Sequence, residues 1–166
     1  MEDRTDGDIT LDVTFDYSLL RSILKIPKVW DRMVDDFSPA VQDYQFPSAG
    51  PELTYLVARW RGAIIGFFMV VKRNPIMVEF HAVLVPLATG AIATAALKTL
   101  LGWIWKYAGA QRIVTTVPDF NKAAQKKAAK IGMTVYGINE RAFIKDGQLG
   151  SQILFGINRE VSPCPS

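Results

Sequence analysis

The chain has 166 residues, of which 49% are hydrophobic and 21% charged. This is the composition of a folded globular protein and excludes a disordered or fibrous one. The length predicts a single domain over residues 1–166. The net charge is only +3 and the basic residues are spread along the chain, so a nucleic-acid partner is not expected.

The two ends indicate a cytoplasmic protein. The acidic start MEDRTDGD lacks the apolar run of a signal peptide, and the single cysteine, Cys164, indicates a reducing compartment. Residues 1–8 and 160–166 are expected to be flexible tails.

The run Phe80–Leu97 has no charged residue and approaches the length of a membrane span, but Pro86 and a change of period favour a buried strand and helix. No membrane association is expected.

The N-terminal third predicts one strand and two helical segments. Ile9–Phe15 alternates and is rich in β-branched residues, as strands are. Asp16 is a candidate cap for a helix that begins at Tyr17, and Lys28–Asp36 is expected to be a second helical segment. Phe37–Pro51 carries three prolines and is either a loop that orders on binding or a plain surface connection.

Three strands follow with clear turn signals between them. Leu53–Trp60 and Ala63–Lys72 flank Arg61-Gly62, which predicts a hairpin. Arg73-Asn74-Pro75 predicts a turn, so the next strand, Met77–Pro86, should run antiparallel to the second.

An acid and the only histidine share one face of this last strand. Side chains alternate along a strand, so Glu79 and His81 point the same way, roughly 7 Å apart, and a water molecule could bridge them. A carboxylate on an apolar strand is expected to have a raised pKa because of desolvation. The pair is either a general base or a mutually satisfied pair without catalytic function. A metal site is not expected, because the histidine and cysteine ligands that would close one are missing.

Beyond this strand the apolar period becomes helical. Ala93–Ala108 predicts a buried helix with Gly109 as its stop, and Arg112–Val117 predicts another strand. Asp119 or Asn121 is expected to cap a further helix. A solvated face, or alternatively a seat for phosphate groups, is predicted for the lysines of that helix: Lys122, Lys126, Lys127 and Lys130.

The C-terminal third predicts three short strands, Thr134–Gly137, Arg141–Lys145 and Gln152–Asn158, with a turn at Asp146-Gly147. The fold class is therefore α/β (α+β). We expect a mixed, mostly antiparallel sheet of about six to seven strands with helices on both faces.

The central segments resemble those of the GCN5-related N-acetyltransferases, the GNAT family. The matching pieces, over roughly half of the chain, are Val83-Leu84-Val85-Pro86, Thr89-Gly90, Asn121-Lys122-Ala123-Ala124 and Lys130-Ile131-Gly132-Met133. The resemblance implies acetyl-CoA as co-substrate and a small-molecule or protein amine as acceptor. It also implies Glu79 as general base, with His81 sharing the proton, and oxyanion donors on the backbone near Val83–Val85. Coenzyme contacts are implied for Val83, Leu84, Val85, Thr89, Gly90, Ala91, Ile92, Asn121 and Ala124.

The chain departs from the family pattern at its phosphate turn. That turn usually reads Q/R-x-x-G-x-G/A, and the three marked positions here are Thr89, Ile92 and Thr94. Because a bare backbone approaches phosphate most closely, Ile92 is expected to crowd the ligand.

A second departure concerns the general acid. The family's frequent tyrosine falls at Ala128 in this chain. Tyr107 and Tyr136 are the candidate replacements.

A second reading follows from the same region. Glu79-Phe80-His81 before the turn, an alanine-rich helix and Val117-Pro118 ahead of Asn121 also resemble acetyltransferase-like proteins of tailed bacteriophages. Some of those are head-assembly or virion proteins. This resemblance implies a catalytically inactive protein that binds partners in an assembly, in the host cytoplasm or in the virion. Oligomerisation stays open under both readings.

Overall fold

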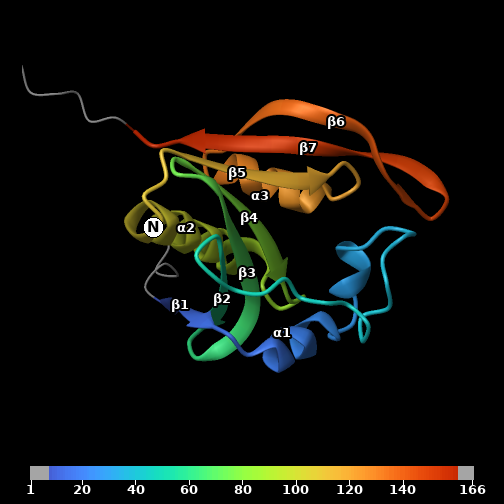
Figure 1. The fold of residues 1–166 in the computed structure, drawn as a ribbon, viewed down its shortest axis with the longest axis horizontal. Coiled ribbons are helices and arrows are strands. Elements are labelled where there is room, and N and C mark those ends of the chain that lie inside the picture. The colour runs from blue at the N-terminus through green and yellow to red at the C-terminus, as the bar shows by residue number, and fades with distance from the viewer. Residues whose placement is uncertain (1–7, 161–166) are drawn as a thin grey trace, which may run out of the picture.

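A computed structural model describes residues 8–160 of the chain. Its centre is a seven-stranded sheet in the order β1-β2-β3-β4-β5-β7-β6 (Figure 1). Only the β4–β5 pair is parallel. The strands are β1 (Ile9–Thr14), β2 (Leu53–Trp60), β3 (Ala63–Asn74), β4 (Met77–Leu84), β5 (Arg112–Pro118), β6 (Thr134–Lys145) and β7 (Gln148–Asn158). The expected mixed, mostly antiparallel sheet is confirmed.

Helices cover both faces of the sheet, also as expected. The α2 helix (Gly90–Tyr107) and α3 (Lys122–Lys130) pack on one face, which we call the α2 face. The α1 helix (Tyr17–Leu24) packs on the opposite face, called the α1 face. Figure 1 shows α1 apart from the other two helices.

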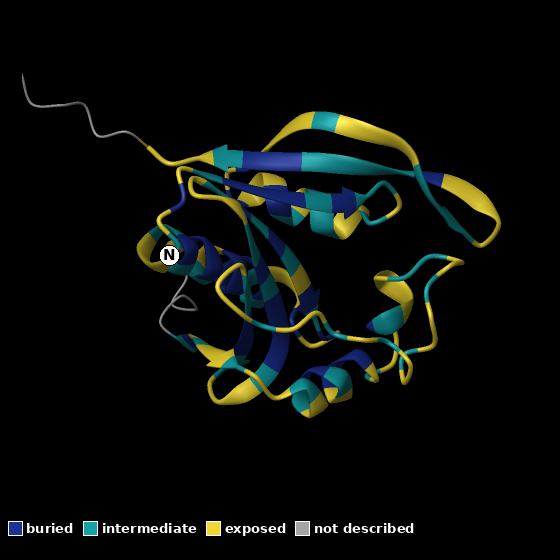
Figure 2. Ribbon diagram, in the orientation of Figure 1, coloured by how far each residue is buried: buried dark blue, intermediate teal, exposed yellow. Residues whose placement is uncertain are grey.

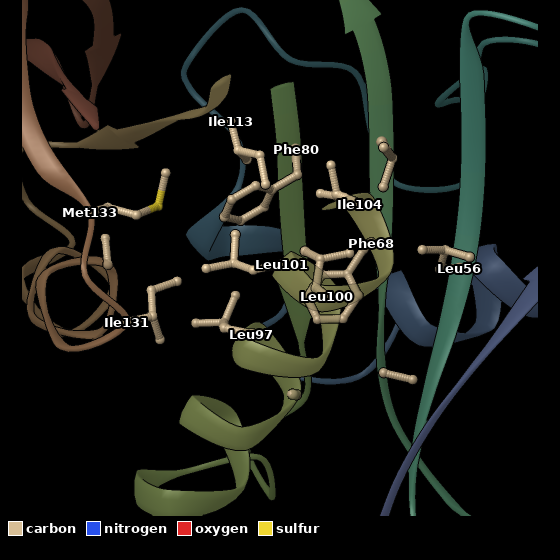
Figure 3. Packing of buried hydrophobic residues seen from close by; sticks show 14 of the residues in the cluster. Leu56, Phe68, Phe80, Leu97, Leu100, Leu101, Ile104, Ile113, Ile131 and Met133 are labelled. Carbon is tan, nitrogen blue, oxygen red and sulfur yellow. The ribbon is translucent and has the colours of Figure 1, made fainter. Parts of the chain in front are cut away.

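Alternation along β4 builds the two cores. Val78 and Phe80 point into the large cluster under α2, where Phe80 lies beside Leu101 (Figure 3). Val83 points into the smaller cluster under α1. Each fully buried aliphatic or aromatic side chain contributes about 1.5–3 kcal/mol relative to exposure, so the sheet is held from both sides. Figure 2 shows the buried residues concentrated in the middle strands and α2.

The predicted helix ends are largely confirmed. Asp16 Oδ1 accepts a hydrogen bond from the Leu19 N–H at 3.0 Å. Asn121 Oδ1 accepts one from Ala124 N–H at 3.1 Å, so Asn121 and not Asp119 caps α3. Gly109 follows the end of α2 with φ of +64°, the left-handed conformation in which helices commonly end.

The second predicted helix, Lys28–Asp36, is wrong. Only a single 3₁₀ turn, η2 (Trp30–Arg32), forms there. Pro27 lacks an N–H group, and Lys28 adopts φ of +69°, which a helix cannot contain. Burial of Val29 in the α1-face cluster takes the place of helix formation.

The loop Phe37–Pro51 packs against the α1 face of the domain. Tyr44 and Phe46 join the α1-face cluster, with ring centroids 5.1 Å apart. The Tyr17 hydroxyl accepts a hydrogen bond from Ala49 N–H at 2.8 Å, and the Tyr55 hydroxyl donates one to the Pro47 carbonyl at 2.9 Å. The segment is therefore a fixed wall of the domain.

The C-terminal strands differ from the prediction in length. Thr134–Gly137 and Arg141–Lys145 are parts of one strand, β6, interrupted by register shifts. The turn at Asp146-Gly147 is confirmed, with φ of +51° and +73°. Because β5 pairs with β7 only from Gln152 to Asn158, the tip of the β6–β7 hairpin extends past β5 towards the loop after η2 (Figure 1).

The predicted tails fall almost wholly outside the described residues, as does Cys164. At the near edge of the first tail, Asp8 makes an ion pair with Arg61 at 2.9 Å. Among residues 8–160 no helix combines the length and hydropathy that crossing a membrane requires.

Candidate active site

The parallel strands β4 and β5 pair over only three positions and then separate. The paired residues are Met77 with Arg112, Val78 with Ile113, and Glu79 with Val114. Just beyond them, the Thr115 hydroxyl donates a hydrogen bond to the Phe80 carbonyl at 2.8 Å. A cleft of about 570 Å³ opens between the remaining halves of the two strands.

The cleft reaches both faces of the sheet. Leu97 and Ala128 line it from the α2-face core. Val29 and Val83 line it from the α1-face core. A donor and an acceptor entering from opposite faces could therefore meet between the strands.

Gly66 in β3 fixes the part of β4 that borders this cleft. A Cβ atom on Gly66 would lie 2.1 Å from the Val83 carbonyl oxygen, and the residue has φ of +146°. Only glycine permits this approach of the two backbones. The glycine within the apolar run Ile64–Phe67 thus has a structural reason.

Glu79 and His81 contact one another directly, without the water expected between them. His81 Nε2 lies 3.2 Å from Glu79 Oε1. The other carboxylate oxygen, Oε2, is held by the guanidinium of Arg73. His81 lines the cleft, whereas Glu79 is not among the lining residues and its side chain is 13% exposed.

The expectation of a raised pKa for Glu79 is wrong. Hydrogen bonding from His81 lowers the pKa of this carboxyl, burial raises it, and the hydrogen bond from Arg73 lowers it again, so the net direction is down. The two donors outweigh desolvation because both favour the charged form. Glu79 is therefore held as a carboxylate.

Backbone N–H groups near Val83–Val85 divide between the two edges of β4. Val85 N–H already donates to the Ile65 carbonyl in β3 at 3.0 Å. Successive N–H groups of a strand point to opposite edges, so the Leu84 N–H points towards β5 and the cleft. Of the three residues, Leu84 is placed to offer a donor there.

The start of α2 presents backbone donors despite its unusual sequence. Thr89, the N-cap, makes no side-chain cap to the helix. Ile92 is half-buried and packs against the α2-face core. The Thr94 hydroxyl donates to the Gly90 carbonyl at 3.1 Å, within the helix. Thr94 thus stabilises the helix, and Ile92 packs on the core. No side chain of the described residues caps the first N–H groups of α2.

The predicted coenzyme-binding residues separate into two groups. Val83, Leu84, Val85, Asn121 and Ala124 line the cleft. Thr89, Gly90, Ala91 and Ile92 do not, but they follow directly after Ala88, which does.

No tyrosine takes the place of a general acid at the cleft. Ala128, which stands at the position of the family's tyrosine, lines the cleft and is buried. Tyr107 is 61% exposed and packs on Trp103, and Tyr136 is 51% exposed beneath Arg112. Neither tyrosine lines the cleft, so both candidates are wrong.

Two basic residues near the site, Arg73 and Arg32, were not foreseen, and a third, Lys127, was foreseen only as one of four lysines on α3. Arg73 was assigned to a turn, but it lies in β3, and its place six residues before Glu79 across a tight hairpin was the available signal. Lys127 lines the cleft, unlike the other three lysines of α3. Arg32 also lines it, from a segment taken for a helix.

Solved structures share this fold, including two that match nearly the whole chain and one that matches part of it. Spermidine/spermine N-acetyltransferase SpeG from Vibrio cholerae, in complex with manganese ions, superimposes with a TM-score of 0.72 at 15% identity, covering 93% of this chain and 94% of that one. Spermidine N-acetyltransferase from Vibrio cholerae in complex with CoA and spermine gives 0.68 at 16% identity, covering 92% and 96%. Mycobacterium smegmatis RimJ in complex with CoA-disulfide gives 0.58 at 22% identity, covering 64% and 53%.

Sequence comparison agrees with the fold. No curated protein matches the chain. The acetyltransferase (GNAT) domain matches residues 20–134, which include most of α1, the strands β4 and β5, and α3. The chain therefore belongs to the GNAT acetyltransferase domain family.

Proposed function

We propose that this protein is an N-acetyltransferase that transfers the acetyl group of acetyl-CoA to an amine, with His81 as the general base and Glu79 as its positioning partner. One observation carries this assignment. His81 lines the cleft while its Nε2 atom contacts the largely buried carboxylate of Glu79, whose side chain is 13% exposed.

The histidine contact determines which ring nitrogen acts. When Nε2–H donates to the Glu79 carboxylate, the lone pair of the neutral ring is on Nδ1. Nδ1 has no partner among the described residues, so it is the nitrogen free to take a proton from the acceptor ammonium. Glu79 stays ionised beside Arg73 and stabilises the imidazolium that forms. This reverses the order expected from the sequence, in which Glu79 acted first.

The remaining steps use the open edge of β4. The neutral amine attacks the thioester carbonyl, a C–N bond forms, and the oxyanion receives a hydrogen bond from Leu84 N–H. Collapse of the intermediate breaks the C–S bond, and the second proton of the attacking nitrogen passes to the departing thiolate to give the neutral amide and free thiol. Since a thiol has a pKa of about 8.5, the coenzyme can depart as a thiolate without a tyrosine at Ala128.

The described residues fit the coenzyme on the α2 face. The N-terminus of an 18-residue helix offers backbone N–H groups and the positive end of its dipole to a pyrophosphate. Asn121 and Ala124 line the cleft beside the path from that helix to Leu84. Lys127, on the same side, adds a positive charge.

The experiment that tests this proposal separates binding from turnover. Thermal unfolding with acetyl-CoA at about one hundred times its Kd should gain roughly 2.7 kcal/mol of stability. Release of free thiol should then be measured with a panel of amines, for the wild type and His81→Gln. Stabilisation with acceptor-dependent thiol release that His81→Gln abolishes is the expected result. No stabilisation at millimolar coenzyme would overturn the proposal.

The alternative, a non-catalytic binding or assembly protein, predicts a different outcome. It rests on the substituted phosphate turn and on Ala128. The turn's substituted side chains serve the helix and core, which weakens the first argument. Coenzyme binding without thiol release for any amine, together with a stable complex with a partner protein, would favour this alternative.

A further inference from the structure

Among residues 8–160, no aspartate or glutamate lines the cleft. Its lining residues include Arg32, His81 and Lys127. The nearest candidate, Glu79, is not a lining residue and both of its oxygens are engaged by Arg73 and His81. An acceptor with several ammonium groups would therefore meet positive charge without a counter-charge.

Arg32 is the cation on the acceptor side. It lies in η2, next to Val29, which belongs to the α1-face core. The start of α2 and Lys127, which we assign to the coenzyme, lie on the α2 face. Arg32 and Lys127 therefore line the same cleft, Arg32 from the α1 face and Lys127 from the α2 face.

Arg32 is also left without a counter-charge by its neighbours. Within residues 8–160 its guanidinium makes no ion pair and no side-chain hydrogen bond. Asp35 instead binds Phe37 N–H at 3.0 Å and the Ser38 hydroxyl at 2.8 Å. Asp36 accepts two backbone N–H groups of the β6–β7 turn. Asp35 and Asp36 are thus used to build the loop. The adjacent Asp31 is exposed and makes no ion pair with Arg32 within residues 8–160.

The backbone that carries Arg32 is held in place. Lys145 Nζ donates to the carbonyl oxygens of Asp31 and Val34, at 2.6 and 2.9 Å, on either side of Arg32. The 3₁₀ turn adds a hydrogen bond from Met33 N–H to the Trp30 carbonyl at 2.9 Å. An unpaired guanidinium on a fixed support at a cleft is suited to bind a carboxylate through two parallel hydrogen bonds.

We propose that the acceptor is an amine that also carries a carboxylate, an amino-acid-like molecule, and that Arg32 binds this carboxylate while the amine faces His81. The inference rests on the proposed acetyltransferase function and names its substrate class. It assigns Arg32 as the residue that determines specificity between amino acids and polyamines.

The test compares acceptors that differ only in charge. Amino acids of increasing length, β-alanine, 4-aminobutyrate and 6-aminohexanoate, are assayed beside the alkylamines and diamines of the same length. At saturating acetyl-CoA, the amino acid of best-fitting length should have a kcat/KM at least about tenfold above its matched amines. Arg32→Gln should abolish that preference mainly through KM, and Arg32→Lys should restore part of it.

Arg159→Gln is the matched control, because it removes the same charge from an exposed residue outside the cleft. It should leave the preference unchanged. A preference for the diamines, reaction with none of the amino acids, or a preference retained in Arg32→Gln would overturn this inference. A tenfold weaker Kd for acetyl-CoA in Arg32→Gln would also overturn it, by assigning the arginine to the coenzyme. The Kd of the wild type separately tests the proposed function, so the two failures are distinguishable.

Discussion

His81 Nε2 lies 3.2 Å from Glu79 Oε1, while Arg73 occupies the second oxygen of the same carboxylate. Glu79 thus contacts Arg73 through one carboxylate oxygen and His81 through the other. These contacts assign proton transfer to the histidine, which lines the cleft, and support to the other two residues.

The kinetics of His81→Gln and Glu79→Gln should reflect these different roles. We expect His81→Gln to lower kcat by about 10²–10⁴, the range for loss of a general base, without changing the Kd for acetyl-CoA. Glu79→Gln should lower kcat less, by at least about tenfold, because the base remains but loses its ionised partner. Steady-state thiol release measures kcat, and calorimetry measures Kd. Glu52→Gln, at an exposed carboxylate, is the control. Unchanged turnover in His81→Gln would exclude the histidine as base.

Stability against pH tests the charge of Glu79. Its pKa is lowered in the folded state, so its contribution is fully present above the pKa of the unfolded chain and is lost as the pH falls towards the folded value. At pH 7, Glu79→Gln should therefore lower the free energy of unfolding by about 1–2 kcal/mol. The difference from wild type should shrink below about pH 4.3, the ordinary value for a glutamate. Urea unfolding at several pH values measures it. A difference that grows in acid would contradict the lowered pKa.

The sheet could be predicted because its signals are local. Alternation, the Arg61-Gly62 and Asp146-Gly147 turns and the Asn121 cap each depend on a few adjacent residues. The segment from Lys28 to Pro51 could not, because its path depends on contacts with β2 and with the β6–β7 turn, far away in the sequence.

The site was only partly predictable for the same reason. The shared face of Glu79 and His81 follows from the period of a strand. The lowered pKa depends on Arg73, which reaches Glu79 across a hairpin, and composition alone suggests only desolvation. Similarly, the fate of Ile92 depends on which side of α2 meets the core.

Gly66 should tolerate no side chain. Its Cβ position lies 2.1 Å from the Val83 carbonyl oxygen, and φ of +146° is unfavourable for any other residue. We expect Gly66→Ala to lower the free energy of unfolding by about 3 kcal/mol, from the clash and backbone strain together. Gly102→Ala is the control, because it lies in α2 with nothing within 4 Å, and it should be neutral or stabilising by up to about 1 kcal/mol. Chemical unfolding compares the two. Equal effects would contradict the role of Gly66 in holding β4.

Asp36 should stabilise the loop that supports Arg32 on the acceptor side of the cleft, without changing the affinity for the coenzyme. Its two carboxylate oxygens accept the Asp146 and Gly147 N–H groups, both at 2.8 Å, and so join the loop after η2 to the β6–β7 turn. In Asp36→Ala these exposed bonds are lost, at a cost of about 1 kcal/mol in stability. The support of Arg32 then loosens, so the KM for the acceptor should rise while the Kd for acetyl-CoA stays constant.

Hydrogen exchange gives the structural readout for this change. The amides of Asp146 and Gly147 should exchange faster in Asp36→Ala than in the wild type, because both donors lose their acceptor. Asp43→Ala, whose side chain makes no hydrogen bond or ion pair within residues 8–160, should change neither exchange nor KM. A weaker Kd for acetyl-CoA in Asp36→Ala would show that this contact serves the coenzyme side of the cleft. Faster exchange with an unchanged KM would mean that the loop supports the fold but does not position the acceptor.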